Sequence, residues 1–173
     1  RNDYGQLGNG NNSDSNVPVA VVTSGVLSGK TIISVAAGVW HSIALASDGT
    51  VYTWGRNAYG ELGNGNAGTD NNVPVAVNTS GVLSDKIIIS IAGGEYNSIA
   101  LASDGTVYAW GHNDYGQLGN GNNSDSNVPV AVDISGVLSG KTITAIASGR
   151  QHSIALRSDG IVYTWGTNSY GQI

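Results

Sequence analysis

The chain has 173 residues, 40% of them hydrophobic and only 11% charged, so it can bury a core and is not a disordered chain. Its net charge of −5, with seven Lys and Arg residues, argues against nucleic acid as a partner, because binding phosphates requires a basic surface. The sequence has no cysteine for disulfides or thiolate metal sites, and its apolar runs are too short for us to expect membrane insertion.

One string of residues recurs along the whole chain. Residues 4–10 read Tyr-Gly-Gln-Leu-Gly-Asn-Gly, and the string returns at 59–65 with Glu61 in place of the glutamine, at 115–121 unchanged and, in part, from Tyr170. The period of about 55 residues lies in the range of propeller blades and solenoid repeats. We therefore predict one partial domain over residues 1–173. Its expected repeats are 1–55, 56–111 and 112–166, and a further repeat begins at 167–173.

Short strands are expected in chain order. Val17–Val22 resembles the last strand of a repeat, and Thr31–Ala37 is rich in Ile and Val and ends in small residues. His41–Ala46 and Thr50–Trp54 flank an Asp-Gly pair, which is a strong signal for a hairpin. Val73–Val77 follows a polar loop, and the proline near its start suits an edge strand because it lacks a backbone donor. The last four segments are strands A, B, C and D of one repeat.

Four short antiparallel strands in each repeat predict an all-β fold made of β-propeller blades. Strand C carries Val51, Tyr52 and Trp54, so both of its faces are apolar, as expected for a blade that packs between neighbours. No 3.6-residue apolar pattern predicts a helix, and the recurring tryptophans are expected in the core. We predict an array of about three four-stranded blades. Its ring is incomplete unless another chain or further sequence completes it.

The register of the repeats leaves two strands without their usual partners. Val17–Val22 is a strand D with no preceding strand C, and Val162–Trp165 is a strand C with no following strand D. An unpaired edge can accept a strand from another chain. One hypothesis is strand exchange between copies, which would give a six-blade dimer or an open filament. The other is that neighbouring blades belong to a longer protein.

The loops between strands A and B, and between C and D, vary from repeat to repeat. The A–B loops read Val39-Trp40, then Glu95-Tyr96, then Arg150-Gln151, whereas the B–C turns hardly change. Both variable loops are expected on one face, as in a binding module, although drift at exposed positions would also explain the variation. The residues that we predict to bind a partner are Trp40, Tyr96, Arg150, Gln151, Arg56, His112 and Glu95.

No catalytic or metal site is predicted. His41 and Ser42 are neighbours on a strand and point to opposite faces, so they are not a nucleophile pair, and we expect the histidine to fix the A–B loop instead. The Asn-rich loops at 9–16 and 64–72 carry only one carboxylate each, which favours internally hydrogen-bonded turns over calcium binding. We expect no cofactor.

The repeat resembles that of the regulator-of-chromosome-condensation family. The match runs from Ala36-Ala37-Gly38 through His41 to Leu45, then from Asp48 to Gly55, and ends with the Tyr-Gly string and Val73-Pro74. The resemblance implies propeller blades, usually seven in a ring. It also makes protein capture plausible, since relatives include a secreted inhibitor of β-lactamase. The founding member is a guanine-nucleotide exchange factor, but this chain shows no insertion that could serve as a wedge.

We therefore predict a non-enzymatic binding module that presents its A–B and C–D loops to a protein or glycan partner. The alternative is a structural segment of a bacterial cell-surface or extracellular protein that self-associates through its blade edges. The near-identical repeats and the surface rich in Gly, Asn, Ser and Thr favour that alternative. We expect an extracellular or cell-surface location.

Overall fold

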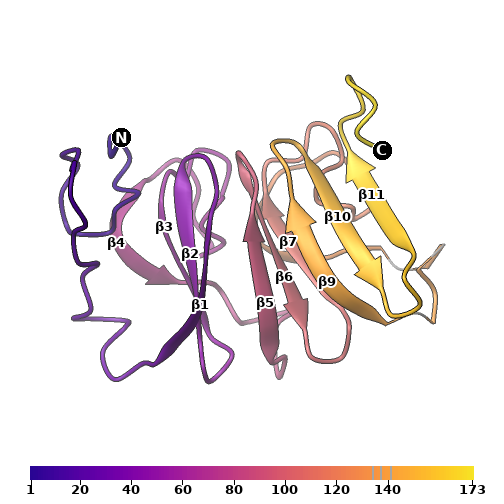
Figure 1. Ribbon diagram of the computed structural model, residues 1–173, viewed down its shortest axis with the longest axis horizontal. Coiled ribbons are helices and arrows are strands. Elements are labelled where there is room, and N and C mark those ends of the chain that lie inside the picture. The colour runs from indigo at the N-terminus through magenta and orange to yellow at the C-terminus, as the bar shows by residue number, and fades with distance from the viewer. Residues whose placement is uncertain (134, 137, 141) are drawn as a thin grey trace.

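The computed structural model describes residues 1–133, 135–136, 138–140 and 142–173, which form three antiparallel sheets and no helix (Figure 1). The first sheet contains β1 (Ile32–Ala37), β2 (His41–Ala46), β3 (Val51–Gly55) and β4 (Asn71–Ala76). The second contains β5 (Ile88–Gly93), β6 (Asn97–Ala102), β7 (Val107–Gly111) and β8 (Ser126–Ala131). The third contains β9 (Ile143–Ser148), β10 (His152–Arg157) and β11 (Val162–Gly166). The predicted all-β blade array is confirmed, and the described part of the chain contains no helix that could cross a membrane.

The Asp-Gly pair makes the predicted hairpin between β2 and β3. Gly49 has a φ of 83° and donates its N–H to the Ala46 carbonyl at 3.0 Å. The Asp48 carboxylate accepts the Thr50 N–H at 3.0 Å and pairs with Lys30 at 2.6 Å. Positive φ costs glycine little, so the turn brings β2 and β3 into register from His41 opposite Gly55 to Leu45 opposite Val51.

The three sheets stand side by side in an open array, with the two chain ends at opposite sides (Figure 1). The middle sheet is covered on both faces, and every residue of β6 and β7 is buried. One apolar cluster joins the first two sheets through residues such as Ile43 and Trp110, and a second joins the last two through Leu101 and Ala155. The packing explains why strand C is apolar on both faces.

Each recurring tryptophan links its sheet to the Tyr-Gly string that precedes that sheet in the chain. The Trp110 indole N–H donates to the Glu61 carbonyl at 2.8 Å, and the Ser98 hydroxyl donates to the same oxygen at 2.9 Å. Gly63 lies against the indole ring, where a Cβ would come within 2.6 Å of Nε1. The other two repeats use the same bonds: Trp54 and Ser42 to Gln6, and Trp165 and Ser153 to Gln117. The recurring string is therefore a docking loop for the next sheet.

Strand D also ties neighbouring repeats together. Gly10 donates its N–H to the Asn72 carbonyl at 2.9 Å, and Gly65 donates to Asn127 at the same distance. Asn72 and Asn127 lie at or beside the start of β4 and β8, so each of these strands holds the docking loop of the preceding repeat. The proline expected near the start of strand D lies inside β4, and Pro74 is buried there.

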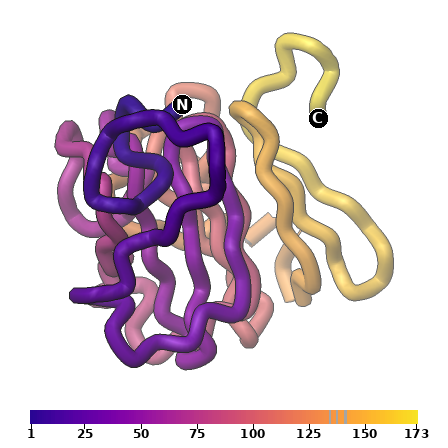
Figure 2. The backbone as a smooth tube through the Cα atoms, turned by 60° about the vertical axis from the view of Figure 1, so that its left-hand side comes forward, coloured from indigo at the N-terminus to yellow at the C-terminus, as the bar shows by residue number. Residues whose placement is uncertain are grey.

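The prediction of a strand at Val17–Val22 was wrong. These residues form no strand and most are exposed, because the described chain places no strand C beside them for a ladder of hydrogen bonds. Val22 nevertheless donates its N–H to the Gly8 carbonyl at 2.9 Å, which fixes the end of the segment. Figure 2 shows this N-terminal segment winding beside the first sheet. At the other end, β11 has β10 as its one strand partner among the described residues.

Candidate functional site

The variable loops lie next to one another, as the sequence predicted. Each C–D loop begins with a backbone bond to the A–B loop of its own sheet: Arg56 donates to the Trp40 carbonyl, and His112 donates to Tyr96, both at 2.9 Å. The A–B loops are also joined across the sheets, since Val39 donates to the Gly94 carbonyl at 3.0 Å. We call the surface formed by these loops, with the docking loops that follow strand C, the loop face.

Arg56 lies at the centre of a row of aromatic side chains on the loop face. Its guanidinium carbon is 4.9 Å from the centre of the Tyr96 ring, 5.2 Å from Tyr4 and 5.9 Å from Tyr59. Tyr59 and Tyr96 meet edge to face, with ring centres 5.3 Å apart. A cation over the faces of aromatic rings is held by their quadrupoles, so the rings restrict where the guanidinium can point.

The aromatic row continues on both sides of Arg56. On one side Tyr4 meets Trp40 edge to face at 5.7 Å, and the Arg1 guanidinium lies 5.7 Å from the Trp40 ring. On the other side Tyr59 lies 4.4 Å from the His112 ring, which is followed by Tyr115 at 6.3 Å. The row therefore crosses all three repeats. Four of its rings are half-buried, the His112 ring is buried and the Tyr115 ring is exposed.

The structure brings together four of the predicted partner-binding residues in this row: Trp40, Arg56, Tyr96 and His112. The sequence analysis missed the tyrosines that join them, Tyr4, Tyr59 and Tyr115. These tyrosines belong to the recurring Tyr-Gly string, which the sequence analysis used only to define the repeat. Their position three residues after the variable residues Arg1, Arg56 and His112 was the signal that they share the loop face.

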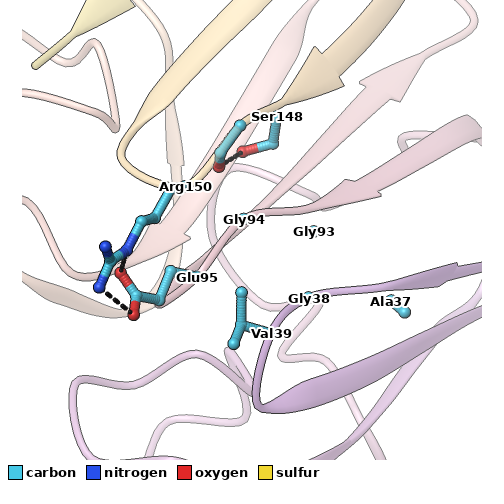
Figure 3. Close-up of a pocket in the computed structure, with 9 residues that line it drawn as sticks. Ala37, Gly38, Val39, Gly93, Gly94, Glu95, Ser148 and Arg150 are labelled. Atoms are coloured by element: carbon cyan, nitrogen blue, oxygen red, sulfur yellow. Dashed lines mark hydrogen bonds and ion pairs between the residues drawn. The ribbon is translucent and has the colours of Figure 1, made fainter. Parts of the chain in front are cut away.

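Glu95 and Arg150 form a pair of their own at the inner end of the loop face. Arg150 donates to both Glu95 carboxylate oxygens, at 2.5 and 3.0 Å, beside a pocket of about 350 Å³ lined by Gly38, Gly93 and Gly94 (Figure 3). The Arg150 guanidinium lowers the pKa of the Glu95 carboxyl, with smaller contributions from the Tyr96 and Trp40 side chains. Glu95 is 3% exposed and both of its carboxylate oxygens are bound by Arg150, whereas Arg150 itself is exposed.

His112 is buried, and both ring nitrogens have partners. The Gln117 amide oxygen accepts the Tyr115 N–H at 3.0 Å, which turns the amide nitrogen toward His112 Nδ1 at 2.9 Å. His112 Nδ1 is then the acceptor, and Nε2–H donates to Asp114 at 3.0 Å. Donor atoms of His112, Asp114 and Asp125 lie within 4.8 Å of one another, and His112 Nε2 is the ring nitrogen that faces Asp114.

Gln151 is the predicted residue that stays apart from both groups. It is half-buried and lines a pocket with His152 and Thr167 at the third sheet, where its carbonyl accepts the Thr167 N–H at 2.9 Å. It has no described contact with the aromatic row. Its role in partner binding stays a prediction.

The expectation that a side-chain hydrogen bond of His41 fixes its own A–B loop was wrong, because among the described residues the ring bonds to the next sheet and Nδ1 has no partner. Its Nε2 bonds to the Ser98 hydroxyl of the next sheet at 2.9 Å, and its ring packs on Gly38, where a Cβ would lie 2.4 Å from the ring. Burial lowers the pKa of His41 to about 4, so the ring is neutral at pH 7. Ser98 is fully buried and donates to the Glu61 carbonyl, so the pair links sheets and has no access to a substrate.

The Asn-rich loops fold on internal hydrogen bonds. The buried Asn57 side chain accepts the Leu62 N–H at 3.1 Å and donates to the Asn66 carbonyl at 3.1 Å. The Asp70 carboxylate accepts the Asn57 N–H at 2.8 Å, and Asn113 and Asp125 repeat the arrangement at 2.7 Å. The carboxylates thus shape the loops that carry the aromatic row.

Comparison with known proteins agrees with the all-β blade fold. A family model described as an RCC1-like domain matches residues 1–173. The ultraviolet-B receptor UVR8 of Arabidopsis thaliana is 39% identical over 173 residues, and the human E3 ubiquitin-protein ligase HERC2 is 35% identical over 171. Human WBSCR16 superimposes with a TM-score of 0.79 at 27% identity, and yeast RCC1 (Prp20), solved bound to Kap60, with 0.67 at 28%.

The chain spans only part of each of these proteins. The UVR8 match covers all of this chain and 37% of UVR8, and the HERC2 match covers 98% of this chain and 3% of HERC2. The structural matches cover 96% of this chain and 41% of WBSCR16, and 80% of this chain and 32% of Prp20. With a family model over its whole length and the repeat resemblance confirmed, the chain belongs to the RCC1-like domain family.

Proposed function

We propose that the chain is a non-enzymatic protein-binding module and that its partner contacts the loop face. The aromatic row centred on Arg56 is the observation that carries this proposal. Tyr, Trp and Arg are the residues that dominate binding energy at protein interfaces, and here they form one continuous row on adjacent loops. Prp20, a structural neighbour, was solved bound to the protein Kap60, which supports protein rather than glycan as the class of partner.

The test compares variants of the two opposite faces. The chain and its variants are used to capture the partner from the native source, and affinity is then measured with the purified partner. We expect Trp40→Ala and Tyr96→Ala each to weaken binding by about tenfold or more, as hot-spot residues do. Ser47→Ala and Ser103→Ala, in exposed B–C turns, are the matched controls and should bind as the parent does.

Equal affinity of all four variants would contradict the proposal. A parallel measurement on a glycan array separates the two classes of partner, because a sugar stacked on Trp40 would also be lost in Trp40→Ala but would bind without any protein. Capture of a glycan and no protein would replace protein with glycan. An extracellular or cell-surface location stays a prediction.

Self-association of the 173-residue chain is a second candidate function, favoured by one observation. Residues 15–20 have the same sequence as β8, are exposed, and lie in no sheet, while β11 has a free outer edge among the described residues. Because Ala109 faces Val130 in the β7–β8 ladder, a donated strand would place Val19 of one copy opposite Thr164 of another.

Engineered cysteines test this candidate, since the chain has none of its own. In a chain carrying Val19→Cys and Thr164→Cys, strand donation predicts disulfide-linked oligomers after mild oxidation. The control pairs Thr164→Cys with Val35→Cys, an exposed position on β1. If both double variants stay monomeric, or if both crosslink equally, strand donation between copies is contradicted.

A further inference from the structure

Arg56 differs from the other described cationic side chains in having no carboxylate partner. Seven residues are Lys or Arg, and six of them lie in the described part of the chain, since residue 141 is outside it. Five of these six form ion pairs: Arg1 with Asp3, Lys30 with Asp48, Lys86 with Asp104, Arg150 with Glu95, and Arg157 with Asp159. Within the described residues, the Arg56 guanidinium has neither an ion pair nor a side-chain hydrogen bond.

The aromatic rings nevertheless hold this guanidinium in place. Tyr4, Tyr59 and Tyr96 come from two docking loops and one A–B loop, and all lie within 5.9 Å of its carbon. Half-buried and restricted in this way, the side chain gives up less freedom when it binds an anion than a surface arginine does. Its N–H donors are free of described protein acceptors, so they can bind a ligand.

The acidic groups near Arg56 form no ion pair with its guanidinium among the described residues, although Glu61 Oε1 is buried without a hydrogen-bond partner. Glu61, five residues on, is fully buried, and burial raises the pKa of its carboxyl against the lowering effect of Arg56. One Glu61 oxygen accepts the Tyr59 N–H at 2.7 Å, and Asp70 accepts the Asn57 N–H at 2.8 Å. Glu95 is held by Arg150. None of these carboxylates forms an ion pair or a hydrogen bond with the Arg56 guanidinium.

We propose that Arg56 and the three tyrosines around it bind an acidic side chain of a protein partner. A single guanidinium fork matches one carboxylate through two parallel hydrogen bonds. The tyrosine rings would contact the methylene groups that carry the carboxylate. One unpaired cation among the described Lys and Arg residues, on a chain with net charge −5, favours a singly charged group over phosphate or a polyanion. This inference rests on the proposed function, because it names what the loop face recognises.

The first experiment uses blocked peptides and nuclear magnetic resonance on the 15N-labelled 173-residue chain. The Nε–Hε signal of Arg56 is followed during titration with acetyl-Gly-Glu-Gly-amide and with its Gln counterpart. The Glu peptide should shift this signal to saturation, and the Gln peptide should not. Equal shifts with both peptides, or no shift with either, would overturn the proposal.

Two further probes distinguish the sources of an anion. Acetyl-Gly-Gly-Gly with a free carboxyl terminus tests for recognition of a chain end, and inorganic phosphate tests for a doubly charged group. A smaller shift of the Arg56 signal with both probes than with the Glu peptide supports an acidic side chain as the ligand. A stronger response to the free carboxyl terminus, or to phosphate, overturns that assignment.

Variants then link the response to Arg56. Arg56→Gln should bind the Glu peptide at least about tenfold more weakly, the ratio expected for loss of a charge-assisted hydrogen bond. Arg56→Lys should fall between the two, since it keeps the charge but loses the planar fork. Arg157→Gln, at the far end of β10, is the matched control and should bind as the parent does.

Binding of the captured protein partner separates this inference from the proposed function. If Trp40→Ala and Tyr96→Ala weaken binding of the partner but Arg56→Gln does not, the proposed carboxylate site is contradicted and the loop face remains the binding surface. If none of the three weakens it, the proposed function falls as well. Both proposals are supported if all three do.

Discussion

Replacing Gly63 with alanine tests how the docking loop receives the next sheet. Gly63 has a φ of 63°, in the left-handed region that L side chains avoid, and a Cβ there would lie 2.6 Å from Nε1 and 2.7 Å from Cδ1 of Trp110. The backbone strain costs about 1–2 kcal/mol. Forcing a methyl group against a fully buried indole costs about 1–3 kcal/mol more. The free energy of unfolding should therefore fall by about 2–5 kcal/mol.

The control is Gly29→Ala. Gly29 has a φ of 71° but no atom within 4 Å of an added Cβ, and the second repeat carries Asp85 at this position with a φ of 59°. The control should lose only the backbone term, about 1–2 kcal/mol. Urea unfolding followed by tryptophan fluorescence and circular dichroism measures both losses. If the two variants lose equal stability, Gly63 does not make room for Trp110 and the account of the docking loop is wrong.

Three further predictions concern buried polar groups. Burial raises the pKa of the Glu61 carboxyl, so its ionised form opposes folding as pH rises above the ordinary pKa of 4.5. Glu61→Gln, which reproduces Gln6 and Gln117, should therefore raise Tm at pH 7 more than at pH 4, and an equal change at both pH values would contradict this. Burial lowers the pKa of His41 to about 4, so the stability that the neutral ring supports above its ordinary pKa of 6.5 should be lost as pH falls from 6.5 toward 4. In thermal unfolding of His41→Asn, which copies Asn97, Tm should depend less on pH in this window, and an unchanged slope would count against the prediction. Trp54→Phe removes the 2.8 Å bond to the Gln6 carbonyl and should cost about 1 kcal/mol or more in urea unfolding, whereas unchanged stability would show that the bond does not hold the docking loop to the first sheet.

Local patterns were sufficient to predict most of the fold. The Asp-Gly turns, the short apolar segments and the period fixed strands A to C to within one residue, since each depends on residues close in sequence. Val17–Val22 failed because a strand requires a partner, and the sequence identity of residues 15–20 with β8 says nothing of what lies beside them. A repeated sequence therefore predicts repeated conformation only where its neighbours are repeated too.

The candidate site was predicted less completely. Comparing the repeats singled out Trp40, Tyr96, Arg56 and His112, because these residues break the pattern. It could not show that Tyr4 and Tyr59 connect them, since a constant residue in a turn looks structural. Nor could it show that Glu95 is buried under Arg150, because that pair joins loops 55 residues apart. Contacts between repeats depend on how the sheets stack, which no single repeat encodes.

Hydrogen exchange of the chain, free and bound to its captured protein partner, tests the central claim most directly. The account predicts that binding slows exchange of backbone amides in the A–B loops at 38–40 and 94–96 and in the docking loops at 56–65 and 112–121. The B–C turns at 47–49, 103–105 and 158–160 should exchange as in the free chain. Protection of those turns, with none on the loop face, would contradict the account.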